Sequence, residues 1–272
     1  MKKSCILTPI HPPKYEFAEK FVRSYNEHFD DLDLFLLFTN ENEKNLFEKS
    51  YPDLKYSSLV YPPGTTTTNH PITEKKYYGA KYLFENTDYE RVALIDADSI
   101  FFRHVDYDEM FTNYLNNGKI YGHTVIKSDT IHKINSDCLR FFPKGDYEKV
   151  QNLTRDFTVY FWFNDIPILE KQSFMEFWDY IDLNNNFQKL ETHDFDWLVY
   201  AYYLLLKGYM QLEISPMHIP SDNGSLIELQ RRIPPDIFIK EYTMINPMWI
   251  QIKIDEQYMK NTFMLVHTDR WW

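Results

Sequence analysis

Short apolar runs alternate with longer amphipathic stretches over the first hundred residues of the chain. The apolar runs predict strands at Cys5–Pro9, Leu32–Phe38, Lys55–Val60 and Arg91–Asp96. The amphipathic stretches predict helices from about Tyr15 to His28, Glu43 to Lys49 and Thr73 to Glu85. This alternation is typical of a parallel sheet covered by helices, and Arg91–Asp96 (RVALID) is apolar enough to be a central strand.

The pattern after Asp98 is mixed. We expect strands at Lys119–Ile126, Phe157–Phe163 and Phe263–His267, and helices at Ser173–Ile181 and Asp194–Leu206. The second helix is followed by Gly208, as a helix C-terminus should be. Neither an internal repeat nor a low-complexity linker divides the chain. We therefore expect a single α/β domain spanning residues 1–272, with a Rossmann-like, mostly parallel sheet in residues 1–99 and a C-terminal lobe in residues 100–272.

Composition narrows the class of protein. The chain has 272 residues, of which 44% are hydrophobic and 25% charged, and this is typical of a soluble globular protein. A formal net charge of −11 disfavours broad electrostatic binding to nucleic acid or to an anionic membrane surface. The apolar stretch near the N-terminus is too short for a signal peptide or a membrane span. We expect a cytoplasmic protein without a transmembrane segment, and peripheral membrane association stays open.

Cysteine and aromatic content add little that is specific. Cys5 and Cys138 give neither a disulfide framework nor metal-ligand spacing. The 21 Tyr, 21 Phe and six Trp suit carbohydrate recognition, because an aromatic face stacks on a sugar ring. Core packing is the commoner explanation for any single aromatic residue.

Two carboxylates, Asp96 and Asp98, stand where the most apolar strand ends. Ligands of open α/β sheets bind at the carboxyl ends of the strands. Two hard oxygen ligands suit Mg²⁺ or Mn²⁺. Such an ion, when bound, keeps coordination positions open for diphosphate oxygens. A D-x-D string alone is weak, since it often marks a solvated turn. The preceding apolar strand and three β/α units strengthen the functional interpretation.

The stretch Tyr78–Ser99 (YGAKYLFENTDYERVALIDADS) resembles the corresponding segment of GT-A glycosyltransferases, in particular family 8 and related bacterial polysaccharide and lipopolysaccharide enzymes. The resemblance implies that residues 1–99 bind a nucleotide-sugar, with Asp96 contacting the metal and the ribose and Asp98 a direct metal ligand. It also implies that Lys81 binds the phosphate or the sugar of the donor. A solvent-exposed lysine on the helix, without a role in binding, is nearly as good an interpretation. The residues expected at the nucleotide are Thr8, Lys81, Asp96, Ala97 and Asp98.

The C-terminal segment Phe263–Trp272 (FMLVHTDRWW) delivers a histidine after an apolar run. By the same resemblance, His267 would complete the metal site, Arg270 would bind phosphate and Trp271 would cover the donor. The segment departs from family 8, because it lacks the glycine and the lysine-proline-tryptophan ending of that family. A lone histidine is more often structural than a ligand.

Three acids open the predicted helix at residue 194. Glu191, Asp194 and Asp196 are candidates for a catalytic acid or base, since an inverting transferase needs one carboxylate to accept the acceptor proton. A capped helix explains them equally well. Asp194 and Asp196 resemble the acids of the family 8 D-Q-D segment, but Phe195 replaces the glutamine. The choice between inverting and retaining mechanisms stays open.

We therefore expect a metal-dependent glycosyltransferase of the hexosyltransferase type, with Mn²⁺ or Mg²⁺ as cofactor. A UDP-sugar is the first choice of donor, a glycan or glycolipid the acceptor, and bacterial surface polysaccharide synthesis the setting. One alternative is a phosphohydrolase of the haloacid dehalogenase type that uses Asp96 and Asp98. The other is a non-catalytic sugar-binding protein with a structural metal ion.

Overall fold

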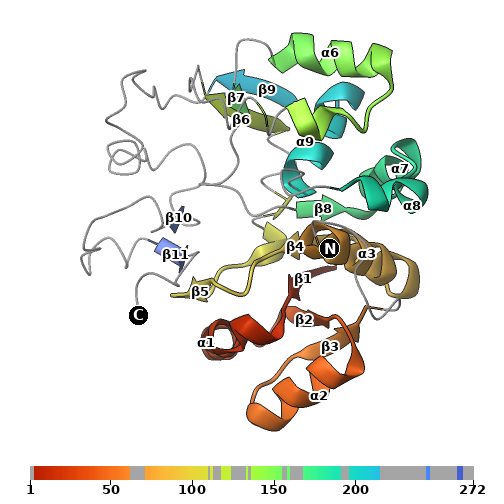
Figure 1. Ribbon diagram of the computed structural model, residues 1–272. Coiled ribbons are helices and arrows are strands. Elements are labelled where there is room, and N and C mark those ends of the chain that lie inside the picture. Colours follow the sequence, from red (N-terminus) through yellow and green to blue (C-terminus); the bar gives the residue numbers. More distant parts are fainter. Residues whose placement is uncertain are drawn as a thin grey trace.

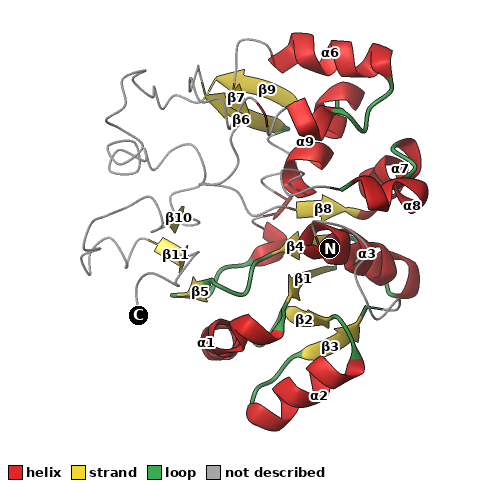
Figure 2. Cartoon of the chain, in the orientation of Figure 1, coloured by secondary structure: helices red, strands yellow, loops and turns green. Residues whose placement is uncertain are grey.

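A computed structural model describes residues 3–61, 71–109, 111–112, 118–123, 133, 136–154, 158–159, 168–190, 196–214, 243–245 and 262–265. Helices flank a central five-stranded sheet, and shorter strands form two further sheets (Figures 1 and 2). The expected α/β class is confirmed.

The central sheet has the strand order β3-β2-β1-β4-β8. Its strands are β1 (Ser4–Pro9), β2 (Asp33–Phe38), β3 (Ser57–Val60), β4 (Arg91–Leu94) and β8 (Ile168–Glu170). The first four strands are parallel, and β8 runs antiparallel to β4. All six residues of β1 and all four of β4 are buried, because both strands are interior to the sheet and covered on both faces.

Helices cover the two faces of this sheet. On one face, α1 (Tyr15–His28) packs beside α2 (Glu41–Ser50), with the rings of Tyr15 and Phe47 5.0 Å apart. On the other, α3 (Pro71–Asn86) packs beside α7 (Lys171–Tyr180). The ring of Tyr77 on α3 lies 5.6 Å from that of Phe177 on α7. Figure 1 shows α1 and α3 on opposite sides of β1.

The order of the strands creates a switch point between β1 and β4. From β1 the chain steps outward through α1 to β2 and through α2 to β3, and then returns through α3 to β4 on the other side of β1. The helices on the two sides of this point therefore lie on opposite faces of the sheet. Open α/β sheets bind ligands in the crevice outside the carboxyl ends of the strands at such a point.

The second half of the chain adds two small sheets and several helices. One sheet has the order β7-β6-β9 and the other β10-β11-β5. Their strands are β5 (Ile100–Phe101), β6 (Lys119–His123), β7 (Thr158–Val159), β9 (Gln211–Ile214), β10 (Thr243–Ile245) and β11 (Thr262–Leu265). The helical elements are η1 (Pro12–Lys14), α6 (Lys144–Thr154), α8 (Leu183–Asn186), η2 (Phe187–Lys189) and α9 (Asp196–Lys207).

Both helices expected in this half are present as α7 and α9, and Gly208 follows α9 with a positive φ of 73°. Helix α6 and strand β8 were not predicted. Because β8 pairs with β4, the second half of the chain supplies the last strand of the central sheet. None of the helices in the described residues is long and apolar enough to cross a membrane.

Helix α3 lies unusually close to the sheet at Gly79. A Cβ at this position would lie 2.7 Å from Leu37 Cδ2 and 3.0 Å from Leu7 Cδ2. The absence of a side chain therefore allows the helix to approach β1 and β2. This approach brings the first turns of α3 down beside the carboxyl ends of the strands.

Candidate functional site

Asp96 and Asp98 lie just beyond β4, at the switch point. The strand ends at Leu94, two residues earlier than expected, and the Ile95 amide still donates to the Leu7 carbonyl oxygen at 3.2 Å. The side chain of Asp96 is 47% exposed, whereas Oδ1 of Asp98 is buried. The two carboxylates therefore differ in their contact with solvent.

Thr8 and Ala97 are both buried at the same edge of the sheet, with exposures of 0% and 7%. The hydroxyl of Thr8 has no hydrogen-bond partner among the described residues, and neither has the buried hydroxyl of Ser99. An unsatisfied buried hydroxyl costs about 1–3 kcal/mol. These two oxygens lie at the carboxyl edge of the sheet, one near the end of β1 and one beyond β4.

Lys76 forms an ion pair with Asp96. Its Nζ lies 2.9 Å from Asp96 Oδ1, and the lysine side chain is only 7% exposed. The lysine reaches this carboxylate because α3 begins at the carboxyl edge of the sheet, so that its first turns stand beside the strand ends. A buried ammonium group of this kind fixes the orientation of Asp96 and adds positive charge where an anionic ligand would bind.

The neighbouring Lys75 points to the other side of the switch point. Its Nζ donates to the carbonyl oxygen of Ile10, after β1, at 2.8 Å and to Oγ1 of Thr39, after β2, at 3.2 Å. Burial lowers the pKa of Lys75 to about 8, and the nearby Glu43 carboxylate partly opposes that shift. Burial and the positive charge of Lys75 also lower the pKa of His11.

Glu74 completes a run of three buried charged residues at the start of α3. It is 1% exposed and accepts a hydrogen bond of 2.5 Å from the phenol of Tyr61, which follows β3. Burial and this carboxylate raise the pKa of Tyr61 well above its usual value. Residues 74–76 thus connect the ends of all four parallel strands. Nothing in the sequence distinguishes these side chains from solvated helical charges, apart from their position in the helix that follows β3.

Lys81, expected at the nucleotide, lies elsewhere on α3. It pairs with Glu85 one turn along the helix, and its Nζ is 5.3 Å from the centre of the Trp178 ring on α7. The structure therefore brings Lys76, and not Lys81, to Asp96. The helix periodicity explains the difference, since five residues along an α-helix rotate the side chain away and carry it about 7.5 Å further from the strand ends.

The described residues supply two of the three expected metal ligands. Carboxylate oxygens suit Mg²⁺ and Mn²⁺, so the donor chemistry of Asp96 and Asp98 fits such an ion. No group of three or more His, Cys, Asp or Glu side chains suited to a metal occurs within the described residues. His267, the expected third ligand, lies outside them, as do Arg270 and Trp271.

The candidate catalytic acids also fall largely outside the described part of the chain. Glu191 and Asp194 belong to residues 191–195, which are not described. Asp196 is the first residue of α9, but its side chain is not described. Their roles stay predictions.

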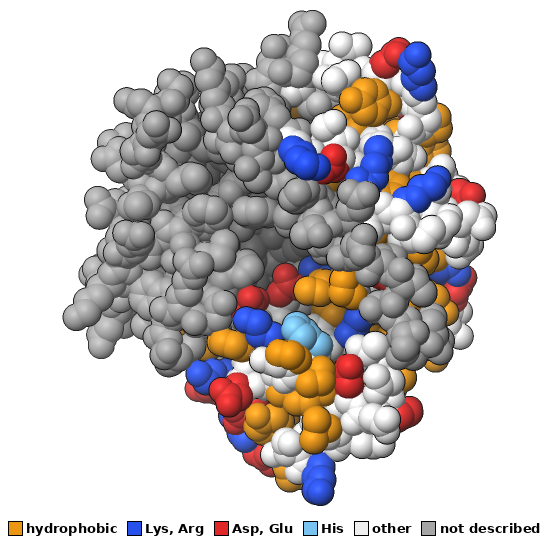
Figure 3. All heavy atoms as spheres, in the orientation of Figure 1, with side chains coloured by type: hydrophobic (Ala, Val, Ile, Leu, Met, Phe, Trp, Pro, Cys, Tyr) orange, Lys and Arg blue, Asp and Glu red, His pale blue; other side chains and the backbone are white. Residues whose placement is uncertain are grey.

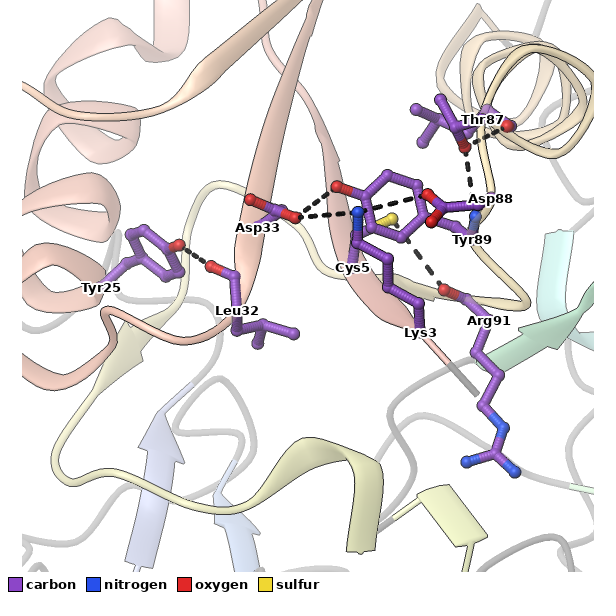
Figure 4. Close-up of polar contacts among 10 residues, drawn as sticks. Lys3, Cys5, Tyr25, Leu32, Asp33, Thr87, Asp88, Tyr89 and Arg91 are labelled. Atoms are coloured by element: carbon purple, nitrogen blue, oxygen red, sulfur yellow. Dashed lines mark hydrogen bonds and ion pairs between the residues drawn. The ribbon is translucent and has the colours of Figure 1, made fainter. Parts of the chain in front are cut away.

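The opposite edge of the sheet also carries charged residues, but these hold the strand starts together. Lys3 Nζ lies 3.2 Å from Asp88 Oδ1 and 4.4 Å from the centre of the Tyr89 ring. The phenol of Tyr89 donates to Asp33, the first residue of β2 (Figure 4). These contacts join the amino ends of β1, β2 and β4, and their role is structural.

Acidic and basic side chains lie intermingled on the described surface in Figure 3. No continuous basic stretch is visible on the described part of that face.

Comparison with known proteins gives no match to a family model and none to a curated protein sequence. Among solved structures, the chain is similar to mouse xyloside xylosyltransferase 1 in its apo form. The TM-score is 0.40 and the identity 7%, over 79% of this chain and 84% of the other. A likeness of this size does not identify the family of the chain.

Proposed function

We propose that this chain is a metal-dependent glycosyltransferase that moves a sugar from a nucleotide-sugar to a glycan or glycolipid acceptor. One observation carries the proposal: Asp96 and Asp98 follow β4 at the switch point, with the buried ammonium of Lys76 2.9 Å from Asp96. Two carboxylates and a cation at this place suit a divalent ion together with a diphosphate.

In this proposal the two carboxylates have different tasks. Asp98 is the direct ligand of the divalent ion, and Asp96 is shared between the ion and the ribose, with Lys76 fixing its orientation. Lys76 replaces Lys81 as the cationic partner of the phosphates or the sugar. A divalent ion, when bound, stabilises the negative charge that develops on the departing diphosphate.

The remaining roles follow the sequence predictions. His267 would be the third metal ligand, with Arg270 and Trp271 closing over the donor. One of Glu191, Asp194 and Asp196 would act on the acceptor hydroxyl. Bacterial surface polysaccharide synthesis is the proposed setting and Mn²⁺ or Mg²⁺ the proposed cofactor.

The position of Asp96 in the fold argues against a phosphohydrolase of the haloacid dehalogenase type. In that class the nucleophilic aspartate follows the first strand, whereas Asp96 follows the fourth strand, β4, after three β/α units.

A thermal-shift screen with UDP, GDP and CMP, each with Mn²⁺ or with EDTA, tests the proposal. We expect at least one nucleotide to stabilise the protein more strongly with Mn²⁺ than with EDTA, and with Mn²⁺ by about 2.7 kcal/mol at a hundredfold excess over Kd. Lys76→Met should lose most of this stabilisation, and Lys81→Met should retain it. The absence of a shift with every nucleotide would contradict the transferase, and a shift with free sugars alone would favour a sugar-binding protein.

A further inference from the structure

Lys75 lies beside Lys76 but contacts the opposite side of the switch point. On the basis of the proposed nucleotide site, we propose that Lys75 is a positioning residue for the nucleoside end of the donor. It holds the turns after β1 and β2 in place, and the base and ribose bind against these two turns. The ligand class is the nucleoside portion of a nucleotide-sugar, and Lys75 acts on it through the two turns.

The geometry of Lys75 suits this task, because one ammonium group joins two turns that are far apart in sequence. Nζ donates to the Ile10 carbonyl oxygen and to the Thr39 hydroxyl oxygen. The turn after β1 is also joined to β2 itself, because the Ile10 amide donates to the Leu37 carbonyl oxygen at 3.0 Å. Lys75 adds α3 to this framework, so that three elements fix one edge of the crevice.

The turn after β2 is itself well ordered by local contacts. The side chain of Asn40 accepts a hydrogen bond from the Glu43 amide at 3.0 Å and so caps α2. The phenol of Tyr15 on α1 donates to the Glu43 carbonyl oxygen at 2.7 Å. Lys75 therefore joins this turn to α3 through Thr39, and the first turn of α2, which follows it, contacts α1 through Tyr15.

The arrangement of the two halves of the chain indicates which end of the ligand lies here. Helices α7 and α9 and strand β8 lie beyond β4, on the side away from β2 and β3 (Figure 1). The transferred sugar must face the half that receives the acceptor. With the diphosphate at Asp96 and Asp98, the nucleoside then extends the other way, over the ends of β1 and β2.

Burial of Lys75 is costly for the fold. Its hydrogen-bond partners are two uncharged oxygens, and burial lowers its pKa to about 8. A charged lysine in such a place destabilises the protein at neutral pH relative to an exposed one. Residues that cost stability are typical of functional sites.

A pair of binding experiments separates the two lysines. The probes are the monophosphate of the nucleotide that stabilises the wild-type protein most, measured in EDTA, and inorganic pyrophosphate, measured with Mn²⁺. For Lys75→Met we expect about tenfold to hundredfold weaker binding of the monophosphate and unchanged binding of pyrophosphate. For Lys76→Met we expect weaker binding of pyrophosphate and unchanged binding of the monophosphate.

Thr39→Val provides a second test that leaves the lysine in place. It removes one acceptor of Lys75, and we expect it to weaken monophosphate binding in the same direction but by less than Lys75→Met. Equal losses for both probes in Lys75→Met, or unchanged monophosphate binding in Lys75→Met and Thr39→Val, would overturn the positioning role. Failure of the wild-type protein to bind any nucleotide would overturn the proposed function itself.

Discussion

Lys75 and Lys76 are adjacent in sequence, yet their environments differ. Lys76 pairs with a carboxylate at 2.9 Å, so its charge is compensated within the protein. The hydrogen bonds of Lys75 go to a carbonyl and a hydroxyl oxygen, and Glu43 only partly offsets the effect of burial on its pKa. Among the single residues of the site, Lys76 is thus neutralised by a carboxylate, whereas Lys75 is a buried cation without an ion-pair partner within hydrogen-bond distance among the described residues.

This difference predicts how stability depends on pH. The pKa of Lys75 is about 8 in the folded protein and 10.5 when the side chain is free, so the unfolded chain binds more protons between these values. Stability should therefore rise through this window, and the penalty for the buried charge is fully present below pH 8. Between pH 7 and pH 10 we expect the wild-type protein to gain about 2–3 kcal/mol relative to Lys75→Met.

Urea denaturation of both proteins at the two pH values measures this change. Because other titrating groups are common to both proteins, the difference between them isolates Lys75. A difference in the free energy of unfolding that stays constant from pH 7 to pH 10 would show that Lys75 titrates as an exposed lysine.

At the scale of elements, α3 is the helix on which the site depends, and Gly79 sets its distance from the sheet. In Gly79→Ala the new Cβ would meet Leu37 and Leu7, both of which are buried. Gly145 on α6 is the matched control, since a Cβ there meets nothing within 4 Å. We expect Gly145→Ala to be neutral or stabilising by up to about 1 kcal/mol. Gly79→Ala should be less stable than the control by about 1–3 kcal/mol.

Thermal or urea unfolding of the two variants measures this difference. Equal stability changes at both positions would mean that α3 does not depend on the missing side chain. A loss of nucleotide affinity in Gly79→Ala alone would further connect the helix position with the site.

The sequence allowed most elements of residues 1–99 to be predicted, because their periodicity is strong. Helix α1 begins and ends at the expected residues, Tyr15 and His28. Strand β8 has three residues and pairs with β4 from far along the chain, so no local pattern indicates it. The buried charges of residues 74–76 could not be predicted either, since burial of a helix terminus against strand ends depends on tertiary packing.

At the scale of the whole molecule, a strongly acidic protein places positive charge where the proposed ligand is anionic. The net charge is −11, whereas Lys75 and Lys76 are buried beneath the ends of β1 and β4. The central sheet continues from these strands into β8, and α7 packs on α3 through Tyr77 and Phe177. The two halves of the chain therefore share one sheet and one helical layer, and the proposed donor site lies where they meet.

In the proposed function, Asp98 holds a divalent ion that binds the nucleotide. Isothermal titration of the best nucleoside diphosphate into the wild-type protein and Asp98→Asn, with Mn²⁺ and with EDTA, tests it most directly. Asp88→Asn is the matched control, since Asp88 is an exposed acid at the opposite edge of the sheet. We expect Mn²⁺ to strengthen binding to the wild-type protein and to Asp88→Asn but not to Asp98→Asn, whose fold stays intact. Equal enhancement by Mn²⁺ in all three proteins would contradict it.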